Sequence, residues 1–105
     1  ATVSTEWSYL DWPVSSADLE KLRGVRFVFT SGSHALEIDG VELLENGKVI
    51  AHDRHAGLAG KPSRGNFYKL SLPKGIHANN GCSLRARVRS VGGKSSNGKL
   101  ELIKE

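Results

Sequence analysis

The segment 83–89 alternates strictly between apolar and charged residues, and this pattern restricts the fold more than any other in the chain. Its apolar members are Leu84, Ala86 and Val88, and arginines occupy the positions between and after them. Successive side chains of a β-strand point to opposite faces of a sheet. The segment therefore predicts a strand with one face in a core and the other toward water, as is typical of antiparallel sheets.

Similar segments recur along the chain, separated by turn residues. Alternating, β-branched or aromatic runs predict strands at 3–7, 25–30, 35–38, 41–44, 49–52, 66–72, 83–89 and 99–103. Turns are expected at Asp39-Gly40 and at Asn46-Gly47, a strong hairpin signal. Longer loops are expected at 54–65, 73–81 and 91–98.

One region departs from the strand pattern. The run 11–13 contains Pro13 and is expected to break the first strand, after which Ser15 or Ser16 caps a helical turn that ends at Gly24. Taken together, the segments predict an all-β fold. We expect an antiparallel β-sandwich, jelly-roll-like, with about eight strands and at most one short helical turn.

Size and composition bound the organisation of the chain. Its 105 residues suit one domain, which we expect to span residues 1–105. The chain begins with Ala1 and contains no Met, so we expect a module excised from a larger protein. The lone Cys82 provides neither an internal disulfide nor a multi-cysteine zinc site. No segment has the length and apolar character of a membrane span.

The arginine row is the clearest charge feature. Arg85, Arg87 and Arg89 share one face of a predicted strand in a chain of net charge +4. Such a row can bind acidic glycans or phosphates. It is also what a solvated outer face looks like when neighbouring strands supply carboxylates, for example Glu101, and this second interpretation is favoured. Nucleic acid is therefore not an expected partner.

The loop after the predicted strand 49–52 holds the densest polar cluster. It begins His52-Asp53-Arg54-His55, and Gly57 and Gly60 follow. These side chains can bind a metal or orient a hydroxyl group, and the glycines can form an anion nest. The favoured interpretation is a loop whose side chains bond its own backbone and whose glycines permit tight turns.

Aromatic residues gather near the start of the chain. Aromatic faces stack on the apolar faces of sugar rings, and Trp7, Tyr9 and Trp12 are candidates for such a platform. Trp7 is expected to be in the core or half-buried. Trp12 stands before Pro13 in a predicted turn and is the better candidate for exposure.

The sequence lacks the short motifs of known enzyme classes. It contains no nucleophile elbow, phosphate-binding loop, dinucleotide fingerprint or zinc-ligand spacing. No two carboxylates have local spacing that indicates a glycosidase pair. The chain is therefore expected not to be an enzyme. No metal site or cofactor is expected, and a structural calcium ion, although plausible in such sandwiches, has no supporting motif.

Several motifs occur in an order that resembles a known group of modules. They are 24–32, Leu36-Glu37-Ile38, Val41-Glu42-Leu43, 46–51, 53–60, 66–70 and 93–98. This order is similar to small β-sandwich modules appended to bacterial β-N-acetylhexosaminidases and related secreted glycoside hydrolases. The resemblance covers most of the chain from Trp7 onward. Its most specific residues are Asp53, His55, Gly57, Gly60, Asn66 and Tyr68.

The resemblance implies a fold like jelly-roll carbohydrate-binding domains, and an accessory role in a secreted or periplasmic bacterial protein. The chain departs from the pattern at Lys94 and Ser95, where an acidic residue is expected before Ser. We expect a non-catalytic carbohydrate-binding module whose partner is a carbohydrate or the parent catalytic domain. The expected sugar-binding residues are Trp12, Tyr9, His55, Arg64 and Asn66. The alternatives are a structural interdomain module without a ligand and an anion binder that uses the arginine row.

Overall fold

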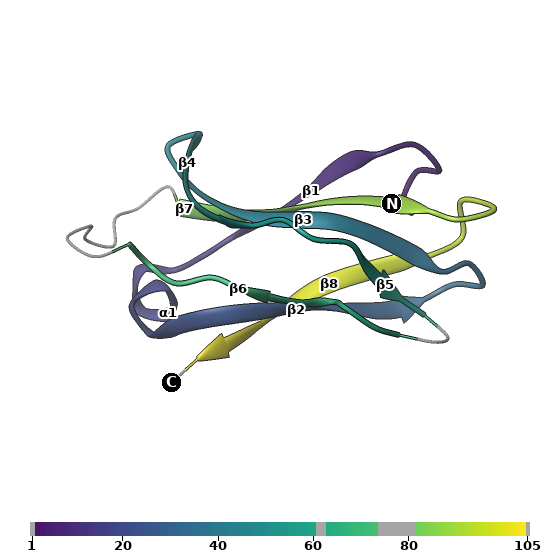
Figure 1. Cartoon of the computed structure of the whole chain (residues 1–105). Coiled ribbons are helices and arrows are strands. Elements are labelled where there is room, and N and C mark those ends of the chain that lie inside the picture. The colour runs from purple at the N-terminus through teal and green to yellow at the C-terminus, as the bar shows by residue number, and fades with distance from the viewer. Residues whose placement is uncertain (1, 61–62, 74–81, 105) are drawn as a thin grey trace.

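Two antiparallel sheets lie face to face in the computed structural model, which describes residues 2–60, 63–73 and 82–104. The larger sheet has the order β1-β7-β3-β4, with β5 also paired to β3, and the smaller one has the order β6-β2-β8 (Figure 1). The expected all-β sandwich with one short helix is therefore confirmed. No helix in the described ranges is long and apolar enough to span a membrane.

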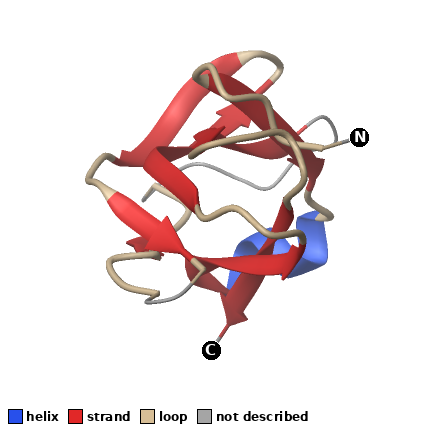
Figure 2. Ribbon diagram, turned by 90° about the vertical axis from the view of Figure 1, so that its right-hand side faces the viewer, coloured by secondary structure: helices blue, strands red, loops and turns tan. Residues whose placement is uncertain are grey.

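The elements follow the expected order closely. The larger sheet contains β1 (Ser8–Pro13), β3 (Leu36–Glu45), β4 (Lys48–Asp53), β5 (Gly57–Ala59) and β7 (Cys82–Ser90). The smaller sheet contains β2 (Leu22–Ser31), β6 (Phe67–Lys69) and β8 (Asn97–Lys104). The helix α1 (Ser16–Lys21) lies where the chain passes from β1 to β2, at one end of the sandwich (Figure 1), and is the blue element in Figure 2. Residues 74–81 of the expected loop 73–81, and residues 61–62 of the loop 54–65, lie outside the described residues.

The core lies between the two sheets. Along β7, from Cys82 to Ser90, buried residues alternate with half-buried ones, as the arginine pattern predicts. The largest fully buried side chains are Tyr68 of β6 and Phe27 of β2. They meet leucines and valines of β3 and β7 across the interlayer space. Burial of this apolar surface is the main stabilising contribution to such a sandwich.

The start of the chain differs from the prediction. The strand lies at Ser8–Pro13 rather than at 3–7, so Asp11, Trp12 and Pro13 belong to it instead of breaking it. The reason is that β1 pairs only with β7 and forms an edge of its sheet. A proline is tolerated at the end of an edge strand, because its missing N–H removes no ladder hydrogen bond. Ser15 does cap the helix, with its Oγ accepting from Asp18 N at 3.2 Å.

The helix ends earlier than expected. Its last residue is Lys21, and Gly24 lies within β2 instead of ending the helical turn. A Cβ at Gly24 would lie 2.7 Å from the Tyr68 carbonyl oxygen. The glycine therefore permits the close approach of β6 to β2 and has a packing role, not a terminating one.

The predicted turn at Asp39-Gly40 is also wrong. The chain runs straight through as one strand, β3, and the register against β7 shifts between Ile38 and Gly40. Asp-Gly is compatible with a tight turn and with a β-bulge, and pairing with β7 on both sides selects the bulge here. By contrast, the Asn46-Gly47 hairpin is confirmed, with φ of 50° at Asn46 and 83° at Gly47.

Candidate functional site

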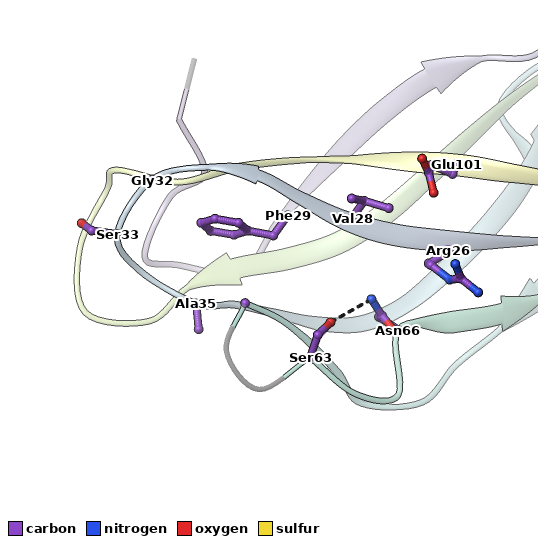
Figure 3. Close-up of a pocket in the computed structure, with 10 residues that line it drawn as sticks. Arg26, Val28, Phe29, Gly32, Ser33, Ala35, Ser63, Asn66 and Glu101 are labelled. Carbon is purple, nitrogen blue, oxygen red and sulfur yellow. Dashed lines mark hydrogen bonds between the residues drawn. The ribbon is translucent and has the colours of Figure 1, made fainter.

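A groove of about 650 Å³ lies beside β2 in the described part of the chain. It is bounded by the outward face of β2 and β8 on one side and by the segment that leads to β6 on the other (Figure 3). One end is formed by the turn between β2 and β3. The lining residues are Arg26, Val28, Phe29, Gly32, Ser33, Ala35, Gly60, Ser63, Asn66 and Glu101. Its size suits one or two sugar rings or another small polar ligand.

Two opposite charges stand at one side of the groove. Arg26 of β2 and Glu101 of β8 are cross-strand partners, and both are exposed. No described residue forms an ion pair or side-chain hydrogen bond with either one. Next to Arg26 on the outward face of β2 lies Val28, a half-buried apolar residue. The site thus presents a free guanidinium, a free carboxylate and an apolar contact surface.

Asn66 joins the groove to the fold. Its main-chain oxygen accepts from Phe27 N at 2.9 Å, and its Nδ2 donates to Phe27 O at 2.6 Å. The same Nδ2 donates to Ser63 Oγ at 3.2 Å (Figure 3). Because a carbonyl only accepts, these bonds fix which side-chain atom is the nitrogen. The Oδ1 of Asn66 accepts from none of the described residues and is available to a ligand donor.

Polar side chains anchor the end of the groove. Ser95 Oγ lies 2.6 Å from His34 Nδ1 and 2.9 Å from Ser33 Oγ, and it accepts from Ser33 N at 3.1 Å. Ser96, which is fully buried, accepts from His34 N at 2.9 Å. These bonds join the turn between β2 and β3 to the loop between β7 and β8. Ser95, where the chain departs from the pattern of the modules that its sequence resembles, therefore joins two loops at the end of the groove.

The Asp53–Tyr68 cluster is a self-bonded loop, as the favoured interpretation predicts. The His55 ring stacks on the Tyr68 ring, and its two nitrogens lie 3.2 Å from Asp53 Oδ1 and 3.0 Å from Gly65 O. Tyr68 donates from its hydroxyl to His55 O at 3.1 Å, and Asp53 Oδ2 accepts from Lys69 N at 2.7 Å. Both ring nitrogens of His55 are thus occupied within the loop.

Gly57 is a steric requirement of this loop. A Cβ at this position would lie 2.5 Å from Gly65 O and 2.6 Å from the Tyr68 hydroxyl oxygen. The loop also contains β5, which the sequence did not predict. A strand of three residues carries too little alternation to be recognised without its partner β3.

The aromatic residues near the start do not form a sugar-stacking platform. Trp12 packs against the core and meets the Phe27 ring edge to face at 6.4 Å, so its expected exposure is wrong. It points inward because even-numbered residues of β1 face the core. Trp7 is half-buried as expected, but Arg87 and Arg89 lie over its ring. Tyr9 is 49% exposed, with the Arg85 guanidinium 4.2 Å from its ring centroid.

The arginine row is neutralised along its length. Arg85, Arg87 and Arg89 pair with Glu42, Asp39 and Glu37 of the adjacent strand β3. The solvated-face interpretation is thus supported, but its carboxylates come from β3 and not from Glu101, which belongs to the other sheet. Glu42 also pairs with Arg54 at 2.6 Å. Burial alone would raise the pKa of Glu42, but hydrogen bonds and charges from Arg85 and Arg54 outweigh it and hold that pKa below its usual range.

The expected sugar-binding residues therefore occupy different parts of the molecule. Asn66 lines the groove, whereas Arg64 is exposed beside a smaller hollow with Glu37 and Leu58. Sequence reasoning missed Arg26 as a groove residue. Its signal was the outward position in a strongly predicted strand, but its pairing with Glu101 requires the register between β2 and β8.

Neither a metal-binding group among the described residues nor a known relative indicates a further functional site. The described residues contain no group of three or more His, Cys, Asp or Glu side chains placed to hold a metal ion. A comparison with protein-family models finds no matching family, and a comparison with curated proteins finds no matching relative.

Proposed function

We propose that this chain is a non-catalytic carbohydrate-binding module of a secreted or periplasmic bacterial glycoside hydrolase or related protein, and that the sugar lies in the groove beside β2. The observation that carries the proposal is the combination of unpaired Arg26 and Glu101 with the apolar Val28 along a hollow of about 650 Å³. Sugars present hydroxyl groups that both donate and accept, and C–H faces that favour apolar contact. A guanidinium donor and a carboxylate acceptor complement such hydroxyls.

The position of Asn66 also supports the groove beside β2 as the sugar-binding site. Asn66 was expected to bind sugar, and the structure places it in the groove with Oδ1 unused by any described residue. The groove is shallow and lacks an exposed tryptophan on its wall, so the affinity is expected to be weak. Shallow sites leave little surplus energy after the cost of ordering the ligand. Attachment to a catalytic domain on a polymeric substrate would compensate through effective concentration.

The alternative of an anion binder has less support, because each arginine of the row already pairs with a carboxylate on β3. The alternative of an interdomain module predicts a contiguous apolar patch. Among the described residues the large exposed apolar side chains are Tyr9, Phe67 and Val91, which belong to different elements. Tyr9 and Phe67 are on strands of opposite sheets. This distribution does not favour a broad apolar interface.

The test is a chemical-shift titration of the isotope-labelled chain with glucose, galactose, N-acetylglucosamine, chitobiose and a heparin fragment. Backbone shifts grouped at Arg26, Asn66 and Glu101 with a neutral sugar are the expected result. Arg26→Ala is expected to weaken that binding about tenfold or more, since hydrogen bonds to charged groups contribute about 1.5–3 kcal/mol. Arg64→Ala is the matched control and is expected to leave it unchanged.

Two results would remove the proposal. Absence of shifts with every neutral sugar at concentrations of tens of millimolar would favour the interdomain module. Shifts confined to the arginine row with heparin, lost on addition of salt, would favour the anion binder.

A further inference from the structure

The outward face of the smaller sheet carries a cation on each of its three strands. Arg26 lies on the central strand β2, Lys69 on β6 and Lys99 on β8, and all three are exposed. The register makes Phe67 and Glu101 the direct cross-strand partners of Arg26. Lys69 is two residues after Phe67, and Lys99 is two residues before Glu101. Both lysines are therefore diagonal neighbours of Arg26, at roughly 7–8 Å, and the three cations form a line across the sheet.

These three cations lack the partners that the arginine row has. On the larger sheet, each arginine of the row pairs with a carboxylate of β3. Among the described residues, by contrast, no carboxylate forms an ion pair with Arg26, Lys69 or Lys99. The described residues of β2, β6 and β8 contribute one carboxylate, that of Glu101. Because three cations stand against one anion, this face attracts anionic ligands.

An aromatic ring lies beside the line of cations. Phe67, the partner of Arg26 on β6, is 45% exposed. A Cβ at Gly24 would lie 3.0 Å from Cζ of Phe67, so the tip of the ring lies over this glycine and the ring leans along the sheet. Such a ring offers an apolar surface to the C–H face of a sugar. The face thus combines an aromatic contact with a guanidinium next to it.

Together these groups complement an acidic sugar better than a nucleic acid. A planar carboxylate matches the guanidinium of Arg26, which can donate two parallel hydrogen bonds to it. The Glu101 carboxylate only accepts, so it requires a donor such as a sugar hydroxyl, which a phosphodiester group lacks. Binding of single-stranded nucleic acid also uses a series of stacked aromatic rings. On the described part of this face, Phe67 is the one large exposed aromatic side chain.

We infer that the outward face of the smaller sheet binds a chain of uronic acid units, an inference that rests on the proposed function and names the class of its carbohydrate. One carboxylate would pair with Arg26, and a hydroxyl of the same sugar would donate to Glu101, where both side chains line the groove (Figure 3). An adjoining sugar would contact Phe67. Carboxylates farther along the chain would approach Lys69 and Lys99, because a polyuronate repeats its charge along its length.

The test compares pairs of ligands, matched except at C6, on the whole chain: galactose with galacturonate, and tetragalacturonate with its methyl ester. Galacturonate is expected to bind about tenfold more tightly than galactose, because its carboxylate gains charge-assisted hydrogen bonds. Tetragalacturonate is expected to bind more tightly still and to shift the backbone signals of Lys69 and Lys99. Raising the salt concentration from about 50 to 200 mM should weaken its binding about threefold or more and leave that of the methyl ester unchanged.

A pair of lysine variants separates this face from the overall charge of the chain. Lys99→Gln removes one cation of the line and is expected to weaken tetragalacturonate binding about threefold. Lys48→Gln removes the same charge at the start of β4 in the larger sheet, and is expected to leave that binding unchanged. Both lysines are exposed, so neither substitution is expected to change the unfolding midpoint.

The outcomes distinguish the inference from the proposed function. Equal binding of galactose and galacturonate would overturn the inference and leave the proposed function in place. Equal losses in Lys99→Gln and Lys48→Gln would do the same, since they would indicate general charge attraction. A thymidine octanucleotide that binds more tightly than tetragalacturonate would overturn both and identify a nucleic-acid site. Silence with every ligand would also overturn both.

Discussion

The His55 ring lies face to face with the Tyr68 ring, with 4.2 Å between their centroids and 20° between their planes. The Tyr68 hydroxyl donates to the carbonyl of the same histidine at 3.1 Å. A fully buried residue of the smaller sheet is thereby joined twice to the loop that follows β4. His55 and Tyr68, which belong to the most specific part of the resemblance, therefore hold the loop after β4 against the core.

Tyr68→Phe tests the contribution of that hydroxyl. The variant keeps the ring stacking and loses one hydrogen bond, so the free energy of unfolding is expected to fall by about 1 kcal/mol. Urea denaturation monitored by tryptophan fluorescence measures the change. Tyr9→Phe serves as the control, because the Tyr9 side chain is exposed and is expected to change stability by less than about 0.5 kcal/mol. Equal effects of the two substitutions would contradict this account.

Stability is expected to fall as the pH rises above about 10. Burial, together with the charges of Asp53 and Asp39, raises the pKa of Tyr68 well above its usual value. Between the ordinary pKa and the raised one, the unfolded chain loses its phenol proton and the folded chain keeps it, so alkali favours unfolding. Denaturation midpoints from pH 8 to 11 are the measurement. Tyr68→Phe should show a shallower decline than the unsubstituted chain, and parallel declines would exclude Tyr68 as the cause.

Glu42 is expected to make the fold sensitive to acid. Its pKa lies below the usual range, so its stabilising effect is present above the unfolded pKa of about 4.3 and is lost as the pH falls through the folded value. Glu42→Gln leaves Arg85 and Arg54 without their carboxylate and is expected to cost about 1–3 kcal/mol at pH 7. This difference should shrink when the pH is lowered toward 2.

The matched control for Glu42 is Asp39→Asn. Its ion pair with Arg87 joins two half-exposed side chains, and exposed pairs contribute about 0–1 kcal/mol. Urea denaturation of both variants at several pH values makes the comparison. A constant loss for Glu42→Gln at all pH values would show that packing, not charge, accounts for its effect.

The sequence was informative where a single strand carries its own signal. Alternation along β7 predicted which side chains are buried, and Asn46-Gly47 predicted a hairpin, because both depend on local geometry. Asp39-Gly40 was misread, since a bulge and a turn share the same residue preferences and only the pairing with β7 distinguishes them. Trp12 was misplaced for a similar reason. Its inward direction depends on β1 starting at Ser8 and continuing through Pro13.

The residues that form the groove could not be predicted from short stretches of the sequence. Arg26 and Glu101 come together through the register of β2 against β8, and β6 pairs with β2 only from Gly24 to Arg26 among the described residues. Neither fact leaves a mark in a stretch of neighbouring residues. Asn66 was predicted as a site residue, but its bonds to Phe27, which terminate the pairing between β6 and β2, depend on the tertiary structure.

Asn66→Asp tests whether this residue supports the groove through its side-chain donor. The substitution keeps the shape but places a carboxylate oxygen against Phe27 O, where Nδ2 now donates at 2.6 Å. The free energy of unfolding is expected to fall by about 1–3 kcal/mol at pH 7, the cost of a lost donor facing a carbonyl. A protonated carboxyl can donate, so the loss should diminish as the pH falls below about 4. Asn46→Asp in the exposed hairpin is the control, expected to change stability by less than about 0.5 kcal/mol. Urea denaturation at pH 7 and pH 3 measures both, and a loss that stays the same at pH 3 would show that the Nδ2 donor is not what holds Asn66 against β2.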